Sequence, residues 1–424
     1  MAAAVARVMV DSPLPQLDRL FDYGVPAQLA SQAVAGVRVR VPLRSAGRVA
    51  DGYIVEVVES ADYSGALSDL ESVVSPIRVL TPEVWALARR AADRAAGSAT
   101  DIVRLAVPGR QVRVEKAYLA DESNEAIPVV TAVPVDGYGS GVIESALAAN
   151  ERLAVDAPPL VQVLPDGVWV GGWAVCMARA AASVVQGGRT AILAVPDYRD
   201  QEQLESALRA VLPADCVVRL DARQPNPDRY RAFLRCLSDR PLAIVGNRSV
   251  VYAPAANLGL IALWDDGDPL YSEPLAPYVY ARDAALLRQE QQDCALMFLG
   301  HSRSTEVERL VELGWLRSIS PVPLVLPKIV PTANQAAGDR LAAQARIPSA
   351  AWRVAREALA TGPVLVQVSR PGYAPSLACV DCNQTARCER CEGPLAQKSS
   401  RSVPACLWCG ALAAQWHCSN CGGE

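Results

Sequence analysis

The chain has 424 residues, of which 51% are hydrophobic and 20% charged, with a formal net charge of −4 at pH 7. This length allows two to four domains, and the composition can supply a large core rather than a disordered chain. The charge gives no chain-wide signature of nucleic-acid binding, so such a function must depend on local patches. The sequence shows neither a signal-peptide pattern nor a run of about 18 apolar residues. We therefore expect a cytoplasmic protein without membrane-spanning segments.

The first 112 residues are predicted to form a small β-rich domain. Three segments show the apolar alternation of strands: 5–10, 36–42 and 52–58. In the second of these, valines alternate with Arg38 and Arg40. A helix is predicted from Thr81 to about residue 97, because Thr81 suits an N-cap and Pro82 the first turn. Residues 113–165 have little periodicity and are predicted to be a connector.

Helices and buried strands alternate from residue 166 to residue 320. The predicted strands are 190–195, 217–220, 242–245, 258–263 and 296–299, and the predicted helices are 174–186, 201–212, 227–237, 280–290 and 305–313. Strands separated by helices of this length are typical of a parallel α/β sheet. The Pro-rich residues 321–348 are predicted to be a linker. A helix at 350–360 and a strand at 364–368 then begin a second α/β unit (349–378) that does not continue.

Four Cys-x-x-Cys pairs occupy residues 379–424: Cys379/Cys382, Cys388/Cys391, Cys406/Cys409 and Cys418/Cys421. Two such pairs supply the four thiolates of one tetrahedral site, so the spacing predicts two Zn²⁺ ions per chain. The alternative is a disulfide framework, which needs an oxidising compartment that nothing in the sequence indicates. The pairs could combine sequentially, interleaved or nested. His417 could replace one thiolate, although eight cysteines suffice. The other four cysteines, Cys176, Cys216, Cys236 and Cys294, are predicted to be reduced core residues.

Five motifs occur in a fixed order along the chain: Leu20-Phe-Asp-Tyr23 with the strand 36–42, Gly246-Asn-Arg-Ser249 with residues 252–261, Tyr280-Ala-Arg-Asp283, Arg370-Pro-Gly-Tyr-Ala-Pro375, and the cysteine pairs. In this order the motifs resemble those of the PriA-type replication-restart proteins (primosomal protein N′), which are superfamily-two DNA helicases. The resemblance implies a 3′-end DNA-binding domain at 1–112, a RecA-like helicase lobe at 166–320, the start of a second lobe at 349–378 and a two-zinc module at 379–424. It further implies that the winged-helix domain usual in the family is absent or vestigial within 113–165.

The same resemblance implies which residues form the sites. Cys379, Cys382, Cys418 and Cys421 would hold one zinc ion, and Cys388, Cys391, Cys406 and Cys409 the other, which is the nested arrangement. The implied DNA-binding residues are Phe21, Asp22, Tyr23, Gly36, Arg38 and Arg40.

For Phe21 and Asp22 the chemistry is simple, because a ring can stack on a terminal base and a carboxylate can accept a hydrogen bond from a 3′-hydroxyl. The alternative for residues 21–23 is an ordinary turn with two core aromatics. For Arg38 and Arg40, the alternative to phosphate contact is a solvated sheet face. Glu71 stands where relatives commonly have a lysine that faces phosphate. This departure weakens the expected affinity.

Three motifs for ATP hydrolysis depart from the family pattern. The segment that corresponds to the P-loop lacks the lysine that holds phosphate and the hydroxyl residue that holds Mg²⁺. Its sequence is Trp169-Val-Gly-Gly-Trp-Ala-Val-Cys-Met177. Trp264-Asp-Asp-Gly267 replaces the Mg²⁺-binding aspartate of D-E-E-H by Trp264, and Gly300-His-Ser-Arg303 replaces G-S-A-T. Asp265, Asp266 and Asp268 are therefore predicted to form a solvated loop rather than a metal cluster. We therefore do not expect ATP to be a cofactor of this chain. Similar losses of ATPase motifs are typical of the actinobacterial members of the family.

The resemblance thus implies a DNA-binding protein of replication restart that recognises stalled forks and 3′ ends, and the departures in the ATPase motifs indicate that it lacks helicase activity. Primosome or helicase-loading proteins are the expected partners of its zinc module, in which Trp408 and Trp416 are expected to pack rather than to stack on bases. One alternative is an ATP-dependent 3′→5′ helicase of the same family that still binds nucleotide. Another is a truncated, non-functional gene product.

Overall fold

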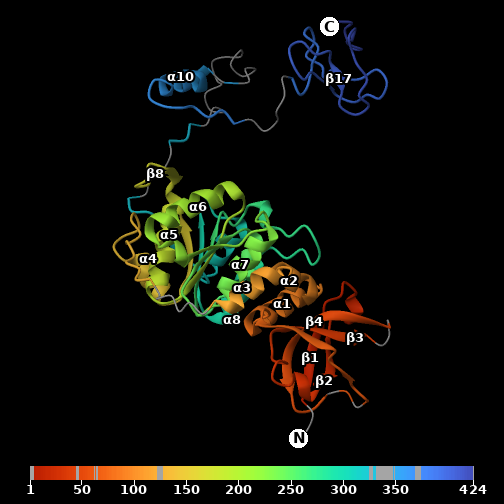
Figure 1. Ribbon diagram of the computed structural model, residues 1–424. Helices are drawn as coiled ribbons and strands as arrows, with labels where there is room; N and C mark the ends of the chain where they lie inside the picture. Colours follow the sequence, from red (N-terminus) through yellow and green to blue (C-terminus); the bar gives the residue numbers. More distant parts are fainter. Residues whose placement is uncertain are drawn as a thin grey trace. The chain divides into compact units, whose positions relative to one another are not determined.

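The computed structural model describes residues 4–43, 47–61, 63, 65–121, 128–323, 328–330, 347, 349–367 and 374–423. The chain divides into two compact units, Met1–Leu326 and Pro327–Glu424, and each is described by itself (Figure 1). Within the described parts of the chain, no helix is long and apolar enough to cross a membrane.

A six-stranded sheet opens the first unit, with the strand order β5-β2-β1-β4-β3-β6. Its pairs are antiparallel except that β2 and β5 are parallel. The alternation predicted for the second segment is confirmed, because Val37, Val39 and Val41 are buried whereas Arg38 is half-buried and Arg40 exposed. The strands are β1 (Val5–Val10), β2 (Leu20–Gly24), β3 (Val37–Leu43), β4 (Arg48–Val58), β5 (Ser68–Asp69) and β6 (Ser72–Arg78).

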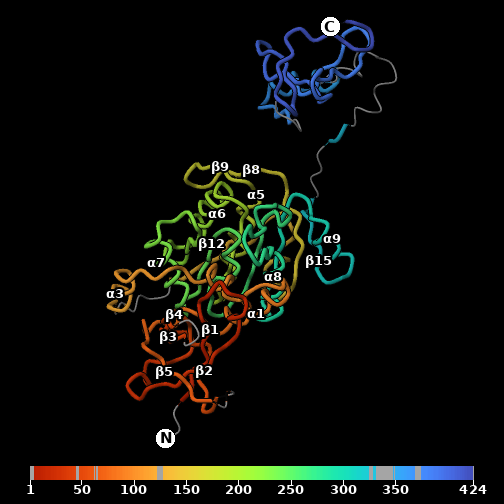
Figure 2. The backbone as a smooth tube through the Cα atoms, turned by 90° about the vertical axis from the view of Figure 1, so that its right-hand side faces the viewer, coloured from red at the N-terminus to blue at the C-terminus, as the bar shows by residue number. Residues whose placement is uncertain are grey.

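Two helices after the sheet, α1 (Pro82–Arg94) and α2 (Ala99–Ala106), lie between the sheet and the following α/β lobe (Figures 1 and 2). The helix predicted from Thr81 is confirmed as α1. Buried residues of α1 and α2 belong to the same hydrophobic cluster as those of the lobe, for example Leu87 with Leu263. The β-rich domain and the lobe therefore share one core.

The lobe contains a seven-stranded sheet with the order β11-β12-β10-β13-β14-β7-β15, in which every pair is parallel. All residues of β10, β12 and β13 are buried, which explains their continuous apolar runs. The predicted parallel α/β lobe is thus confirmed. Its strands are β7 (Arg152–Asp156), β10 (Thr190–Ala194), β11 (Val217–Arg219), β12 (Ala243–Gly246), β13 (Leu258–Trp264), β14 (Ala295–Gly300) and β15 (Arg317–Ile319). Its main helices are α5 (Gly172–Gln186), α6 (Tyr198–Val211), α7 (Asn226–Cys236), α8 (Ala281–Gln292) and α9 (Thr305–Glu312).

The prediction that 113–165 is only a connector is wrong. After α3 (Val112–Ala120), this segment contains α4 (Val142–Ala148), β7 and β8 (Val161–Val163), and β8 pairs with β9 (Trp169–Gly171). β7 lies inside the lobe sheet between β14 and β15, so the lobe begins before residue 166. Only three consecutive residues of β7 are apolar, Leu153 to Val155. Their burial depends on strands far along the chain, which no local pattern shows.

The second unit contains the helix α10 (Ser349–Ala358) and the cysteine module. None of the residues of α10 is buried. Residues 364–367 form no strand, contrary to the prediction, and residue 368 lies outside the described residues, as do residues 370–373 of the Arg370–Pro375 motif. In the module, β16 (Leu395–Ala396) pairs with β17 (Ala405–Cys406) beside a small core of Ala386, Cys388, Leu395 and Cys406.

Candidate functional site

A pocket of about 710 Å³ lies at strand β2, and the three consecutive residues Phe21, Asp22 and Tyr23 all line it. The tight pairing of β2 with β1 brings Asp22 opposite Arg7. The other lining residues are Arg7, Leu17, Arg19, Leu20, Pro42, Leu43, Tyr63, Ala66, Leu67 and Ser68. The structure therefore combines rings, a carboxylate and guanidinium groups in one concave site.

Polar contacts hold Asp22 in position within this pocket. The Arg7 Nε lies 3.6 Å from Asp22 Oδ1, and the backbone N–H of Tyr63 donates to Asp22 Oδ2 at 3.4 Å. Arg7 also donates to Glu56 at 2.7 Å. The Tyr23 hydroxyl donates to the Pro42 carbonyl at 3.3 Å, and burial raises the pKa of Tyr23, so this hydroxyl stays protonated at neutral pH. The result is an ordered anionic acceptor beside aromatic side chains.

Arg7, Arg19 and Tyr63 were not identified from the sequence as pocket residues. The Arg19 guanidinium carbon lies 4.7 Å from the centroid of the Phe21 ring. The Tyr63 side chain is 64% exposed. Arg19 could have been found, because it directly precedes Leu20-Phe-Asp-Tyr23. Tyr63 lies in a loop far along the chain and carries no such signal.

Gly36, Arg38 and Arg40 do not line the pocket, and neither does Glu71. Gly36 has φ +93°, and a Cβ there would approach the Leu80 carbonyl to 2.8 Å, so packing accounts for this glycine. Arg38 donates to the Pro108 carbonyl at 2.7 Å and its guanidinium lies 5.9 Å from the Tyr230 ring of the lobe.

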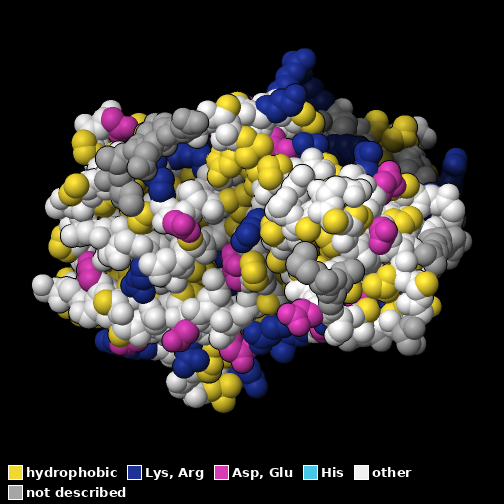
Figure 3. Space-filling model, turned by 60° about the horizontal axis from the view of Figure 1, so that its bottom comes forward, with side chains coloured by type: hydrophobic (Ala, Val, Ile, Leu, Met, Phe, Trp, Pro, Cys, Tyr) yellow, Lys and Arg dark blue, Asp and Glu magenta, His cyan; other side chains and the backbone are white. Residues whose placement is uncertain are grey.

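Arg40 is exposed and lies 3.5 Å from Asp51. On the face in Figure 3, Lys and Arg side chains are interspersed with acidic and hydrophobic ones rather than gathered in one patch. The surface shown there therefore lacks a single broad basic stripe.

The eight module cysteines form two clusters: Cys379, Cys382, Cys418 and Cys421, and Cys388, Cys391, Cys406 and Cys409. Within each cluster the sulfurs lie within 4.8 Å of one another, and the grouping is nested. Closest cross-knuckle Sγ–Sγ distances are 3.5 to 3.7 Å. A disulfide would need about 2.05 Å. Zn–S bonds of about 2.3 Å give tetrahedral edges of roughly 3.8 Å, so the donor set fits zinc.

The knuckles also supply hydrogen bonds that favour thiolates. The backbone N–H groups of Arg390 and Trp408 donate to the sulfurs of Cys388 and Cys406. A backbone hydrogen bond from Gln384 is the largest cause that lowers the pKa of Cys382, whereas hydrogen bonds among the thiols raise the pKa of Cys421 in the same cluster. His417 belongs to neither cluster. The remaining four cysteines are buried and free, as predicted.

The two tryptophans of the module differ. Trp416 packs against the small core, and its Nε1 donates to the Arg387 carbonyl at 2.8 Å, so the packing prediction is confirmed for Trp416. Trp408 is 70% exposed and lies outside this small core, with its ring next to Gly393.

Two buried tryptophans lie where the helicase pattern has phosphate- and metal-binding residues. Placing the last glycine of G-x-T-G-S-G-K-T on Gly172 puts Trp173 at the lysine and Ala174 at the hydroxyl residue. The Trp173 and Trp264 rings stack at 4.3 Å with an interplanar angle of 11°. His301 contacts Trp264 edge-on at 5.0 Å. An aromatic stack therefore joins the start of α5 to the ends of β13 and β14.

The acidic residues after β13 form hydrogen bonds with different partners. Asp266 is buried and accepts from Arg282 at 2.9 Å and from the Ser304 hydroxyl at 2.6 Å. Asp268 caps the turn at Leu270. Among the described residues, only the cysteines form groups that could hold a metal ion. The prediction of a solvated loop is therefore wrong for Asp266, whose carboxylate is buried and paired.

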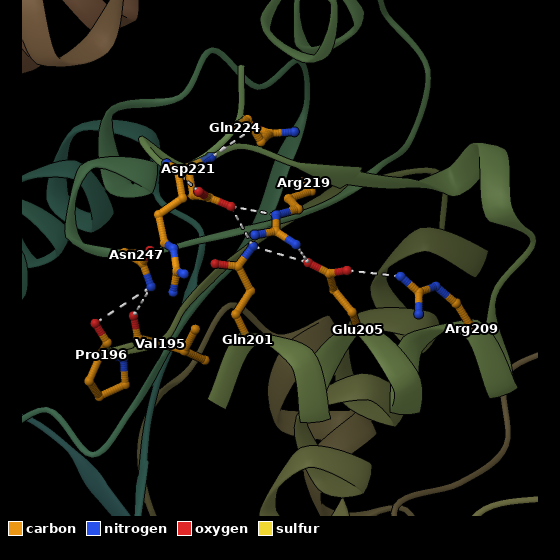
Figure 4. A network of polar contacts seen from close by, with 10 residues as sticks. Val195, Pro196, Gln201, Glu205, Arg209, Arg219, Asp221, Gln224 and Asn247 are labelled. Atoms are coloured by element: carbon orange, nitrogen blue, oxygen red, sulfur yellow. Dashed lines mark hydrogen bonds and ion pairs between the residues drawn. The ribbon is translucent and has the colours of Figure 1, made fainter. Parts of the chain in front are cut away.

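A polar network at the edge of the lobe involves Asn247 of the Gly246–Ser249 motif (Figure 4). Asn247 donates to the carbonyls of Val195 and Pro196, and so joins the ends of β12 and β10. Nearby, buried Asp221 accepts from Gln201 and Arg219. Burial alone would raise its pKa, but these hydrogen bonds hold the pKa of Asp221 below its usual value. These hydrogen bonds of Asn247 and Asp221 connect neighbouring segments of the lobe.

Comparison with known proteins gives a consistent result. Residues 7–108 match the family model of the PriA 3′DNA-binding domain (3′BD). The chain is 41% identical over 423 residues to the probable replication restart protein PriA of Mycobacterium tuberculosis (strain ATCC 25618 / H37Rv), covering 97% of this chain and 63% of that protein.

More distant relatives carry the same name. Identity is 39% to the probable replication restart protein PriA of Mycobacterium leprae, over 97% of this chain and 64% of that protein. It is 23% to the replication restart protein PriA of Treponema pallidum, over 93% of this chain and 59% of that protein. The chain thus spans less than two thirds of the length of these relatives.

Proposed function

Because the chain belongs to the PriA family of replication restart proteins, we propose that it recognises the free 3′ ends of DNA at stalled forks through the pocket at β2. The observation that carries this proposal is the convergence of Phe21, Asp22 and Tyr23 on one pocket within the matched domain. Phe21 would stack on the terminal base, and Asp22 would accept a hydrogen bond from the 3′-hydroxyl. Arg40, exposed on the same domain, would contribute a phosphate contact.

The C-terminal module is proposed to hold two structural zinc ions and to serve as the surface for primosome or helicase-loading proteins. Zinc supplies the cross-links that the small core of four residues cannot provide. The exposed side chains of Leu407, Trp408 and Leu412, at 61%, 70% and 73%, are the apolar groups that a protein partner would cover.

End recognition is tested by comparing oligonucleotides with a 3′-hydroxyl and with a 3′-phosphate. The full chain should prefer the 3′-hydroxyl about tenfold, because a hydrogen bond to a charged acceptor contributes roughly 1.5–3 kcal/mol. Asp22→Ala should remove this preference without abolishing binding. Glu59→Ala is the matched control, since it removes an exposed carboxylate of the same domain outside the pocket. Equal wild-type affinity for both ends, measured by fluorescence anisotropy, would contradict the proposal.

We further propose that the protein acts without ATP hydrolysis. The stacked Trp173 and Trp264 supply neither an ammonium group for phosphate nor a carboxylate for Mg²⁺. Phosphate release should therefore stay at background when single-stranded or forked DNA is added. A DNA-stimulated turnover in the usual enzyme range of about 1–10³ s⁻¹ would favour the alternative function, a 3′→5′ helicase. A nucleotide titration followed by tryptophan fluorescence separates loss of binding from loss of chemistry.

A further inference from the structure

The pocket at β2 contains a cation that end recognition by Phe21 and Asp22 leaves without a role. Arg19 directly precedes β2, its side chain is exposed, and its guanidinium carbon lies 4.7 Å from the Phe21 ring centroid. Across the described part of the chain, the ion pairs of this pocket involve Arg7 and not Arg19. Arg19 thus contacts the ring that would receive a base.

The charges of the pocket leave Arg19 uncompensated. Three ionised side chains line it, the two cations Arg7 and Arg19 and the anion Asp22, which gives a net charge of +1. Arg7 faces Asp22 at 3.6 Å and Glu56 at 2.7 Å, so two carboxylates offset its charge. The excess positive charge of the pocket therefore lies on Arg19, and it suits an anionic ligand.

We propose that Arg19 forms a phosphate subsite of this pocket, binding the phosphate of the nucleotide whose base stacks on Phe21. The proposal rests on the proposed recognition of DNA ends. A guanidinium binds phosphate in a bidentate manner, and a ring beside it provides the stacking surface. A base that stacks on Phe21 displaces the guanidinium from the ring face but keeps it within reach of the attached phosphate. Glu71 does not line the pocket, so it does not oppose this contact directly.

The test uses the full chain and two single-stranded ligands, a linear oligonucleotide with a free 3′-hydroxyl and a circular DNA without an end. Arg19→Gln should weaken binding of the linear ligand about tenfold, at the low end for a charge-assisted hydrogen bond. It should also reduce the slope of log K against log salt by about 0.7, which corresponds to one phosphate contact. Binding of the circular ligand should not change. Arg19→Lys, which keeps the charge without the planar fork, should give an intermediate loss.

Arg78→Gln is the matched control. Arg78 is an exposed arginine of the same sheet on β6, at the opposite edge from β5 and outside the pocket. It should affect both ligands equally or not at all. Unchanged affinity and slope of Arg19→Gln on the linear ligand, with the wild-type preference for a 3′-hydroxyl intact, would overturn the subsite alone. Tighter binding would also overturn it, because Arg19 would then only cover the Phe21 ring. A wild-type chain without end preference removes the proposed function and the subsite with it.

Discussion

Replacing Cys388 by serine is expected to release about one zinc ion per chain and to unfold the inner half of the cysteine module. Structural zinc contributes an apparent free energy of about 10–16 kcal/mol in small zinc-binding peptides. The module has little else to oppose unfolding, because the buried residues of its hydrophobic cluster, within the described part of the chain, are Ala386, Cys388, Leu395 and Cys406, with five partly buried side chains packed against them. Two of these four residues are themselves thiolates of the inner cluster.

The nested arrangement decides what remains after this substitution. The outer cluster joins residues on both sides of the inner one, Cys379 with Cys421 and Cys382 with Cys418, at 3.5 Å each. Because all four outer sulfurs survive, the outer ion should stay bound with reduced affinity. A sequential arrangement would instead lose the ion shared by Cys379, Cys382, Cys388 and Cys391.

Metal content measured by mass spectrometry separates these arrangements through paired substitutions. Cys388→Ser with Cys406→Ser should release one ion, and Cys388→Ser with Cys382→Ser should release both, whereas a sequential arrangement predicts the reverse. Cys216→Ala, at a buried cysteine of the lobe, is the control and should leave the zinc content unchanged. Two equivalents of zinc retained by Cys388→Ser would contradict the expectation. No metal in wild-type protein purified without chelators would rule out both sites.

A second large effect is expected from Trp173→Ala. Trp173 is 4% exposed and Trp264 6%, and their rings stack at 4.3 Å. Truncation of a buried tryptophan typically costs about 3–5 kcal/mol, to which the lost stacking adds about 0.5–1.5 kcal/mol. The free energy of unfolding of the first unit should fall accordingly in urea denaturation, and the near-ultraviolet circular dichroism should lose the signal of the stacked pair.

Trp169→Ala is the matched control, four residues earlier. Trp169 is 66% exposed on the hairpin of β8 and β9, so its removal should change the stability by about 0.5 kcal/mol or less. Equal losses for the two variants would mean that the stack does not stabilise the lobe. Trp173→Lys should lower the free energy of unfolding rather than restore nucleotide binding, because it places a charge at a position that is only 4% exposed.

Much of the lobe could be predicted from the sequence because its strands are buried on both faces. Continuous apolar segments such as those of β10 and β13 leave a signal that does not depend on the rest of the chain. β7 left no such signal, since its neighbours Met297 and Ser318 are distant in sequence. The strand expected at 364–368 shows the opposite error, an apolar run without a sheet to join.

The sites divide in the same way. Asp22 and the rings beside it are adjacent in sequence, and the regular cysteine spacing carries the metal prediction. The alternation of Arg38 with valines predicted a residue that faces solvent or DNA. Its side chain instead donates to the Pro108 carbonyl and lies near the Tyr230 ring. The stack of Trp173 on Trp264 also could not be predicted, because it depends on how the start of α5 meets the end of β13. Contacts between distant segments require the fold itself.

The core shared by the sheet domain and the lobe limits how this protein can be dissected. A fragment that ends near residue 112 would keep α1 and α2 but expose their buried residues, such as Leu87 and Ile102, to water. It would also leave Arg38 without the Tyr230 ring that it faces. Loss of DNA binding by such a fragment would then report misfolding or aggregation as readily as a missing contact. A fragment that ends at residue 326, the boundary between the two compact units along the chain, keeps this core intact and is better suited to DNA-binding experiments.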